Sequence, residues 1–183
     1  LPIFLLFILS IYIVNASQAR IMTYNLLNFS DDDNREMHYI SILESVLPDL
    51  IVVQEVVGQT GFTHFQSDVL DAFQNGQWSS APFINQSAQQ DIALFFKHDI
   101  FSFVSTGAVA TAQSSGTRDV IEWSMVHDMS ELEFNIYGVH FKASSGSSNA
   151  QQRLEEATIL RQHLNSLSGS YFIVAGDFNI YSN

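Results

Sequence analysis

Four short, strand-like segments of the sequence each end at a polar side chain, and this pattern constrains the fold most. In α/β proteins ligands collect beyond the ends of strands, so four polar ends indicate four strands that deliver side chains to one shared site. The segments with their end residues are Ile21–Tyr24 with Asn25, Leu50–Gln54 with Glu55, Phe134–Val139 with His140, and Tyr171–Gly176 with Asp177. Asn179 follows two positions after the last of them.

The rest of the chain alternates helical and strand-like patterns. Helical spacing predicts helices over residues 35–46, 62–73 and 150–164, and further apolar runs predict strands at 92–96, 101–104 and 120–126. The last helix is expected to bury one apolar stripe, formed by Ala150, Leu154, Ala157, Leu160 and Leu164. Gly58–Gly61 and Ser144–Asn149 are expected to be loops. The sum is a mixed α/β chain, rich in strand, that fits stacked sheets with helices outside them.

The charge of the chain limits what it binds. Its 183 residues include 7 Lys and Arg against 19 Asp and Glu, so the formal net charge is −12. This balance argues against a passive nucleic-acid binder, which needs a basic surface, but not against an enzyme that meets phosphate through a divalent cation. The chain has no cysteine, which excludes disulfides, cysteine-based zinc sites and a thiol nucleophile.

The first nineteen residues have the pattern of a signal peptide. Leu1–Val14 is an apolar run, and Ser17 and Ala19 are the small residues expected before a cleavage site at Arg20. A buried core segment or an uncleaved anchor is the alternative, although the run is shorter than the ~20 residues of a spanning helix. We therefore expect a signal peptide over residues 1–19, a domain over 20–183, and a secreted or periplasmic protein without a stable membrane anchor. No initiator methionine or basic segment precedes the run, so we expect the sequence to start inside an open reading frame.

The polar strand ends suit the chemistry of phosphoester hydrolysis. Mg²⁺ takes oxygen ligands and usually needs one or two carboxylates, which Glu55 and Asp177 can supply. His140 can donate a hydrogen bond to a phosphate oxygen as charge builds on it. Asn25 and Asn179 can orient a metal-bound water, a phosphate or an attacking water without adding charge. Taken singly, each of these residues is more often a turn former or a solvated strand end, and only their combination predicts a site.

Four motifs carry a resemblance to the endonuclease/exonuclease/phosphatase family. Ile21–Leu27 resembles its opening strand motif, Pro48–Val56 its metal-binding motif, Tyr137–Lys142 its histidine motif, and Val174–Asn179 its Gly-Asp-Phe-Asn motif. The order and the spacing also agree, and the resemblance covers residues 20–183. Phe141 stands where the family usually has leucine. Asp91 opens a run that is similar to the family's middle strand.

The resemblance implies a role for each of these residues. Glu55 would be the principal metal ligand, with Asn25 beside it. His140 would contact the scissile phosphate, and Asp177 would orient or activate the attacking water. Asn179 would help to hold the phosphate, and Arg118 would also touch it. The implied cofactor is Mg²⁺, with Mn²⁺ or Ca²⁺ as alternatives.

The resemblance also implies an architecture and an activity. The fold would be two packed, mostly antiparallel β-sheets flanked by helices, a four-layer sandwich, in a monomer. The family continues past Gly-Asp-Phe-Asn to a Ser-Asp-His motif that holds the general base, so we expect a C-terminally truncated chain with little activity of its own. The parent protein would be a secreted nuclease-type phosphodiesterase. The alternatives are a lipid or small-molecule phosphoesterase similar to sphingomyelinases, and a non-catalytic metal-binding or phosphate-binding remnant. For either enzyme, we expect the five site residues to cluster at one edge of the two sheets.

Overall fold

The computed structural model describes residues 18–32, 34–86, 90–114, 116–169 and 171–181. Nearly all of the predicted signal peptide, residues 1–19, lies outside these ranges. The elements are β1 (Ile21–Phe29), α1 (Glu36–Val46), β2 (Leu50–Val56), α2 (Gly58–His64), the π-helical segment η1 (Phe65–Leu70), α3 (Asp71–Phe73), β3 (Trp78–Ser80), β4 (Asp91–Lys97), β5 (Phe101–Val109), β6 (Val120–His127), β7 (Leu132–His140), α4 (Ser147–Ser166) and β8 (Tyr171–Asp177).

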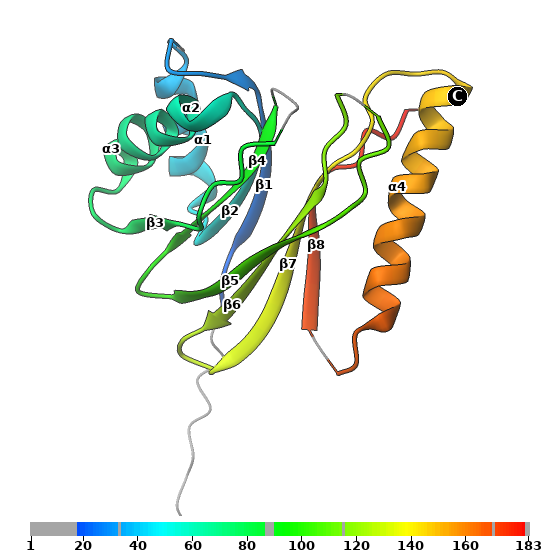
Figure 1. The fold of residues 1–183 in the computed structure, drawn as a ribbon. Helices are drawn as coiled ribbons and strands as arrows, with labels where there is room; N and C mark the ends of the chain where they lie inside the picture. The colour runs from blue at the N-terminus through cyan, green and yellow to red at the C-terminus, as the bar shows by residue number, and fades with distance from the viewer. Residues whose placement is uncertain (1–17, 33, 87–89, 115, 170, 182–183) are drawn as a thin grey trace, which may run out of the picture.

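Two four-stranded sheets pack face to face and carry helices on their outer sides. The strand order is β1-β2-β4-β3 in one sheet and β5-β6-β7-β8 in the other. The pairs β1·β2 and β7·β8 are parallel, whereas the remaining pairs are antiparallel. The helices α1 to α3 cover the first sheet and α4 covers the second (Figure 1). The expected four-layer arrangement of two mostly antiparallel sheets is therefore confirmed.

The alternation of side chains along the strands explains this layering. In β2, Ile51 and Val53 face the helices α1 to α3, whereas Leu50 and Val52 face the other sheet. All four are fully buried, because successive strand residues point to opposite faces and both faces are covered. Trp123 contributes the largest side chain to the core between the sheets.

Helix α4 buries a different face from the one predicted. Leu160 and Leu164 are buried as expected, but Ala150 and Ala157 are exposed and Leu154 is 59% exposed. The fully buried carboxyl of Glu156 completes the inner face instead, because its Oε2 accepts a hydrogen bond from the Lys142 backbone N–H at 2.8 Å. A buried carboxylate is normally excluded from such a stripe unless it has a partner.

The segment Gly58–Gly61, expected to be a loop, forms the first turn of α2. This helix crosses close above β1, where a Cβ atom on Gly61 would lie 2.7 Å from the carbonyl oxygen of Phe29. Glycine is therefore needed here for close approach rather than for a turn. The short strand β3 was not predicted, because Trp78, Ser79 and Ser80 show no alternating pattern.

Two crossover connections bring polar residues to one edge. In each parallel pair, β1·β2 and β7·β8, a helix carries the chain back so that both strands end on the same side. Asn25 lies within β1 rather than at its end, because a bulge between Asn25 and Phe29 extends the strand through Leu27 and Asn28 at positive φ.

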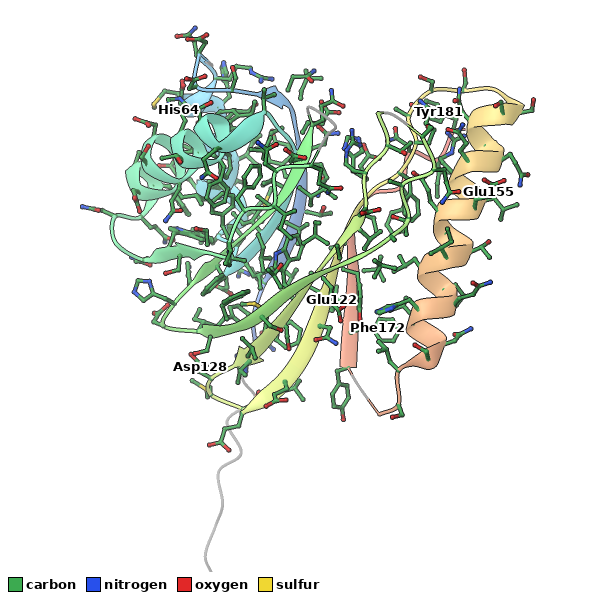
Figure 2. The ribbon with its side chains drawn as sticks, viewed as in Figure 1. His64, Glu122, Asp128, Glu155, Phe172 and Tyr181 are labelled. Atoms are coloured by element: carbon green, nitrogen blue, oxygen red, sulfur yellow. The ribbon has the colours of Figure 1, made fainter. Side chains whose placement is uncertain are left out.

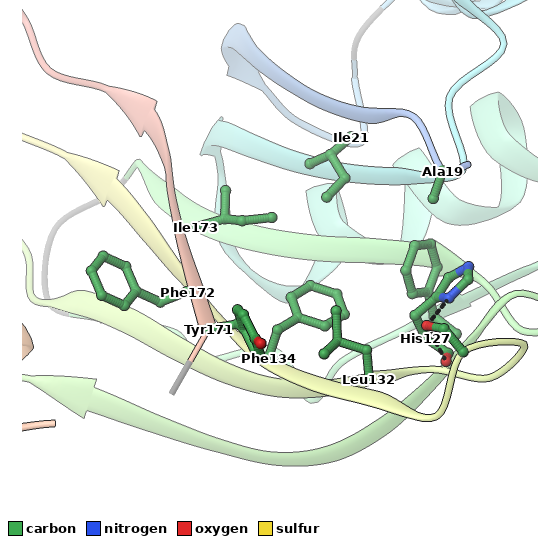
Figure 3. Close-up of a pocket in the computed structure, with 10 residues that line it drawn as sticks. Ala19, Ile21, His127, Leu132, Phe134, Tyr171, Phe172 and Ile173 are labelled. Carbon is green, nitrogen blue, oxygen red and sulfur yellow. Dashed lines mark hydrogen bonds between the residues drawn. The ribbon is translucent and has the colours of Figure 1, made fainter. Parts of the chain in front are cut away.

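An apolar hollow of about 370 Å³ lies between the sheets, next to the start of β8 and away from the edge that carries the polar residues (Figure 3). Its lining includes Ile21, Phe101, Leu132, Phe134, Tyr171 and Ile173. Among the helices of the described residues, none combines the length and the apolar character that crossing a membrane requires.

Candidate functional site

The carboxylates of Glu55 and Asp177 meet at one amide nitrogen. Asn25 Nδ2 donates to Glu55 Oε1 at 2.9 Å and to Asp177 Oδ2 at 3.1 Å. These three residues come from β1, β2 and β8, and therefore from both sheets. The two carboxylates predicted from the sequence thus lie close enough to approach one cation and its water molecules.

The orientation of Asn25 is fixed by the backbone beside it. Its Oδ1 accepts a hydrogen bond from the Leu27 N–H at 2.9 Å, so its nitrogen must point toward the carboxylates. A metal ligand would have to present the oxygen, and in this structure that atom faces Leu27. The metal-binding role of Asn25 therefore stays a prediction, and the observed role is to hold Glu55 and Asp177 together.

Glu55 is held in place by its own unusual backbone and by the bulge of β1. Its φ of 64° lies in the left-handed region, which costs an ordinary residue about 1–2 kcal/mol. This conformation falls at the irregularity of β2 between Val53 and Val56, where the pairing with β4 shifts. The Asn28 backbone N–H donates to Glu55 Oε2 at 3.0 Å. Strain at such a position is typical of functional sites.

His140 is a neutral imidazole placed against Glu55. Its side chain is 2% exposed, and Nε2 lies 3.8 Å from Glu55 Oε1. Burial, together with the nearby Arg118, lowers the pKa of His140 to about 4, although Asp177 and Glu55 oppose that shift. Within the described residues, Nδ1 has no hydrogen-bond partner although it is buried. A neutral histidine can donate one hydrogen bond without adding charge.

Arg118 lies behind His140. The residue is 7% exposed, and one guanidinium nitrogen donates to the His140 carbonyl oxygen at 3.2 Å. Burial lowers its pKa, whereas Asp91 and Glu55 oppose that change. Asp91 is fully buried, and this burial raises its pKa to about 6. In this structure Arg118 supports the backbone of His140, and its predicted contact with phosphate stays a prediction.

Asp177 and Asn179 occupy the end of β8 and the turn after it. The Asn179 backbone N–H donates to Asp177 Oδ1 at 2.8 Å, so both carboxylate oxygens of Asp177 accept hydrogen bonds. Gly176 allows this placement: its φ is 146°, and a Cβ atom there would lie 1.9 Å from the Val139 carbonyl oxygen. The close approach of β8 to β7 sets Asp177 beside His140.

The donor set fits a hard divalent cation. Mg²⁺ needs only one or two protein carboxylates because it keeps several water molecules. Glu55 and Asp177 supply two carboxylates that share a single neutral donor, an arrangement that a cation between them would stabilise. No cluster of three or more Asp, Glu, His or Cys side chains suited to a metal exists in the part of the chain that the structure describes.

Sequence reasoning missed several residues that support the site. Gln90 lies near Glu55, with Nε2 at 3.5 Å from Oε2, and Glu156 holds the segment after His140. Arg153 and Tyr181 contact the same segment. The sequence signal for Glu156 and Arg153 was a carboxylate and an arginine within a predicted helix. That pattern does not distinguish a buried pair of side chains from a solvated helix face.

Residues 22–183 match the family model described as the Endonuclease/Exonuclease/phosphatase family. This match extends over most of the chain and includes both Asn25 and Asp177. The chain belongs to this family, whose members are phosphoester-hydrolysing enzymes that generally depend on a divalent metal. No curated protein matches the sequence.

Solved structures of the family share this fold at low sequence identity. D. rerio TDP2 complexed with single strand DNA product is 15% identical with a TM-score of 0.67, over 88% of this chain and 61% of that one. A Bacteroides thetaiotaomicron mannosyl-6-phosphatase is 17% identical with a TM-score of 0.67, over 89% and 66%. The human Nocturnin catalytic domain with bound sulfate is 20% identical with a TM-score of 0.60, over 81% and 58%. The chain thus spans less than two thirds of the length of each structure.

Proposed function

We propose that this chain provides the metal-binding and phosphate-binding side chains of a secreted, divalent-metal-dependent phosphoester hydrolase, with a nuclease-type phosphodiesterase as the first candidate. The observation that carries the proposal is the meeting of Glu55 and Asp177 at Asn25, with neutral His140 next to Glu55. Membership of the family supports the reaction class. The apolar run at residues 1–14 supports secretion.

Each side chain has a distinct task in the proposed reaction. Glu55 would hold the cation, which when bound polarises a phosphoryl oxygen and neutralises charge. His140 would donate a hydrogen bond to a phosphate oxygen, a contact that strengthens as charge develops there. Asp177 would accept a hydrogen bond from the attacking water and so orient it. Asn179 would help to hold the phosphate. Mg²⁺ is the cation that the oxygen ligands of this site favour, with Mn²⁺ or Ca²⁺ as alternatives.

Two observations bear on the class of substrate, and they point in different directions. A D. rerio relative holds a single-stranded DNA product, which supports a phosphodiester in a nucleic acid. The net charge of −12 favours a small or lipid phosphoester instead, because a long polyanion meets little basic surface on this chain. A lipid or small-molecule phosphoesterase is therefore the second candidate.

The test is a comparison of substrates and variants under metal control. The whole protein, to which this chain contributes these side chains, would be assayed on DNA, RNA, sphingomyelin, bis(p-nitrophenyl) phosphate and p-nitrophenyl phosphate, with Mg²⁺, Mn²⁺ or Ca²⁺ and then with a chelator. We expect Glu55→Ala and Asp177→Ala each to lower the rate by at least about 100-fold, since each removes several kcal/mol of stabilisation. Glu44→Ala, at an exposed position of α1, is the matched control.

The outcomes separate the candidates. Chelator-sensitive cleavage of nucleic acid supports the nuclease, and cleavage of only the lipid or the small esters supports the second candidate. Metal binding by calorimetry without turnover on any substrate supports a non-catalytic remnant and contradicts hydrolysis by these residues. Unchanged rates in both Ala variants contradict the site.

A further inference from the structure

The segment that follows His140, residues 141–144, is held by α4, by the last residue of β8 and by the residues just after it. The Phe141 N–H donates to the Asp177 carbonyl oxygen at 2.9 Å, and the Phe141 carbonyl accepts from Asn179 Nδ2 at 2.9 Å. The Lys142 N–H donates to Glu156 Oε2. This irregular segment therefore has little freedom of its own, since both backbone groups of Phe141 and the N–H of Lys142 are paired.

Arg153 links the segment to Tyr181. One guanidinium nitrogen donates to the carbonyl oxygens of both Lys142 and Ser144, each at 2.9 Å. The same guanidinium lies over the ring of Tyr181, 5.1 Å from its centroid. Figure 2 shows Tyr181 beside the first turns of α4. A cation over an aromatic face is attracted by the ring, so Arg153 restrains the ring.

The hydroxyl of Tyr181 makes two hydrogen bonds whose directions are fixed. The Ser144 N–H donates to it at 2.9 Å, and a backbone N–H can only donate. The hydroxyl hydrogen is then available to Asn179 Oδ1, which lies 3.1 Å away. The Asn179 amide must therefore present its oxygen to Tyr181 and its nitrogen to Phe141.

Asn179 has a left-handed backbone conformation that asparagine tolerates, so the orientation of its side chain depends on its hydrogen-bond partners. Its φ is 49°, a left-handed conformation in the tail after β8, and its N–H caps Asp177 Oδ1. Loss of the hydroxyl of Tyr181 would leave the Asn179 amide held only by its bond to the Phe141 carbonyl and would remove the acceptor of the Ser144 N–H. Asn179 and Asp177 are connected by this N–H, so a change at Tyr181 reaches the carboxylate as well.

We infer that the Tyr181 hydroxyl, held by Arg153, is a positioning group that fixes the side chain of Asn179 for contact with the substrate phosphate. The inference rests on the proposed function, because it assigns Asn179 to the phosphate. It makes Arg153 and Tyr181 positioning residues for the reaction, although neither touches the substrate. It also couples the start of α4 to the end of β8.

The experiment uses Tyr181→Phe, which keeps the ring under Arg153 and removes only the hydroxyl. We expect kcat on bis(p-nitrophenyl) phosphate to fall by about 10-fold, the lower end of what loss of a supporting hydrogen bond costs an active site. In an Asn179→Ala background the same substitution should have no further effect on kcat, because the hydroxyl acts through that amide. Tyr171→Phe, at the exposed start of β8, is the matched control.

A second readout does not need activity. The side-chain amide resonances of Asn179, observed by NMR, should shift in Tyr181→Phe and stay in place in Tyr171→Phe. If the wild-type protein hydrolyses no substrate, the proposed function is contradicted. The amide resonances of Asn179 then still decide the inference. Unchanged resonances in Tyr181→Phe overturn the inference, and so does an equal loss of kcat with and without Asn179, which is the result of a purely structural role.

Discussion

His140 and Asp177 are register partners at the last residues of two parallel strands, β7 and β8. Neighbouring strands lie about 4.8 Å apart, so the backbone alone sets these two residues side by side. Asp177 acts on His140 through this proximity and opposes the fall of its pKa. The pairing therefore fixes a hydrogen-bond donor and a carboxylate relative to one another before any cation or substrate is present.

Asn25→Leu should make the protein depend on metal for its stability. The substitution removes the donor that Glu55 and Asp177 share, and loss of a partner by charged, partly buried groups costs about 1–3 kcal/mol or more. Added Mg²⁺ should raise the melting temperature of this variant more than that of wild type. Thermal unfolding with and without millimolar MgCl₂ measures this, with Asn165→Leu at an exposed position of α4 as the control. If Mg²⁺ raises the melting temperature of all three proteins equally, the bridging role of Asn25 is contradicted.

Gly176→Ala should destabilise the protein by about 3 kcal/mol, because a Cβ atom has no space against the Val139 carbonyl and the backbone is strained. Gly107→Ala is the matched control in another strand, since its Cβ would meet only Glu122 Oε2 at an ordinary 3.7 Å. Urea unfolding of both variants gives the comparison. If the two variants are equally stable, then the close approach of β8 to β7 is not as described.

Glu156 should lower stability as pH rises. Burial raises its pKa above the ordinary value of 4.5, so the folded state binds a proton that the unfolded state has released. Stability associated with this group is thus complete below about pH 4.5 and is lost as the pH rises through the folded pKa. Glu156→Gln keeps an acceptor for the Lys142 N–H and removes the buried charge, so this loss should disappear. Urea unfolding across a pH series measures both proteins.

Glu156→Ala provides the contrast. It leaves the Lys142 N–H without its acceptor, which costs about 1–3 kcal/mol at every pH. Glu155→Gln is the exposed neighbour on the same helix and should change neither the stability nor its pH dependence. A pH dependence that survives in Glu156→Gln would show that another group causes it.

His64 should add a second pH dependence with the same sign. Its Nε2 lies 2.8 Å from Glu36 Oε1 and its Nδ1 lies 3.0 Å from Asp68 Oδ2, and the hydrogen bond to Glu36 raises its pKa above 6.5. The stabilisation is complete below pH 6.5 and is lost as the pH rises through the raised value. NMR titration of His64 should show a lower pKa in Glu36→Gln, whereas Glu44→Gln on the same helix leaves it unchanged.

The sequence predicted the site better than it predicted the contacts within it. Glu55, His140 and Asp177 stand out because each follows a buried strand, and a change from apolar to polar residues is visible in one dimension. The orientation of Asn25 is not visible, because it depends on the Leu27 N–H in a bulge. The roles of Asn25, Glu55, Arg118, His140, Asp177 and Asn179 in metal binding, phosphate binding and catalysis remain predictions, as do the domain boundaries, the monomeric state and the localisation.

Helix α4 shows why the remaining contacts escaped prediction. Its apolar spacing favoured the face with Leu154, but Glu156 and Arg153 instead face the segment after His140. Hydrophobic periodicity assumes that charged residues point to water. Here two charged residues satisfy backbone groups of a neighbouring segment, and only the folded arrangement supplies those partners.

The crossover from β7 through α4 to β8 has a consequence for the order of folding. Parallel strands cannot pair until the connection between them has closed, and that closure costs entropy before any contact repays it. The antiparallel strands β5, β6 and β7 are joined by shorter connections, residues 110–119 and 128–131, and can form first. His140 is then in place early, whereas Asp177 and Asn179 arrive with the last strand. Substitutions that slow the docking of α4 should therefore delay the assembly of the site while leaving the earlier sheet intact.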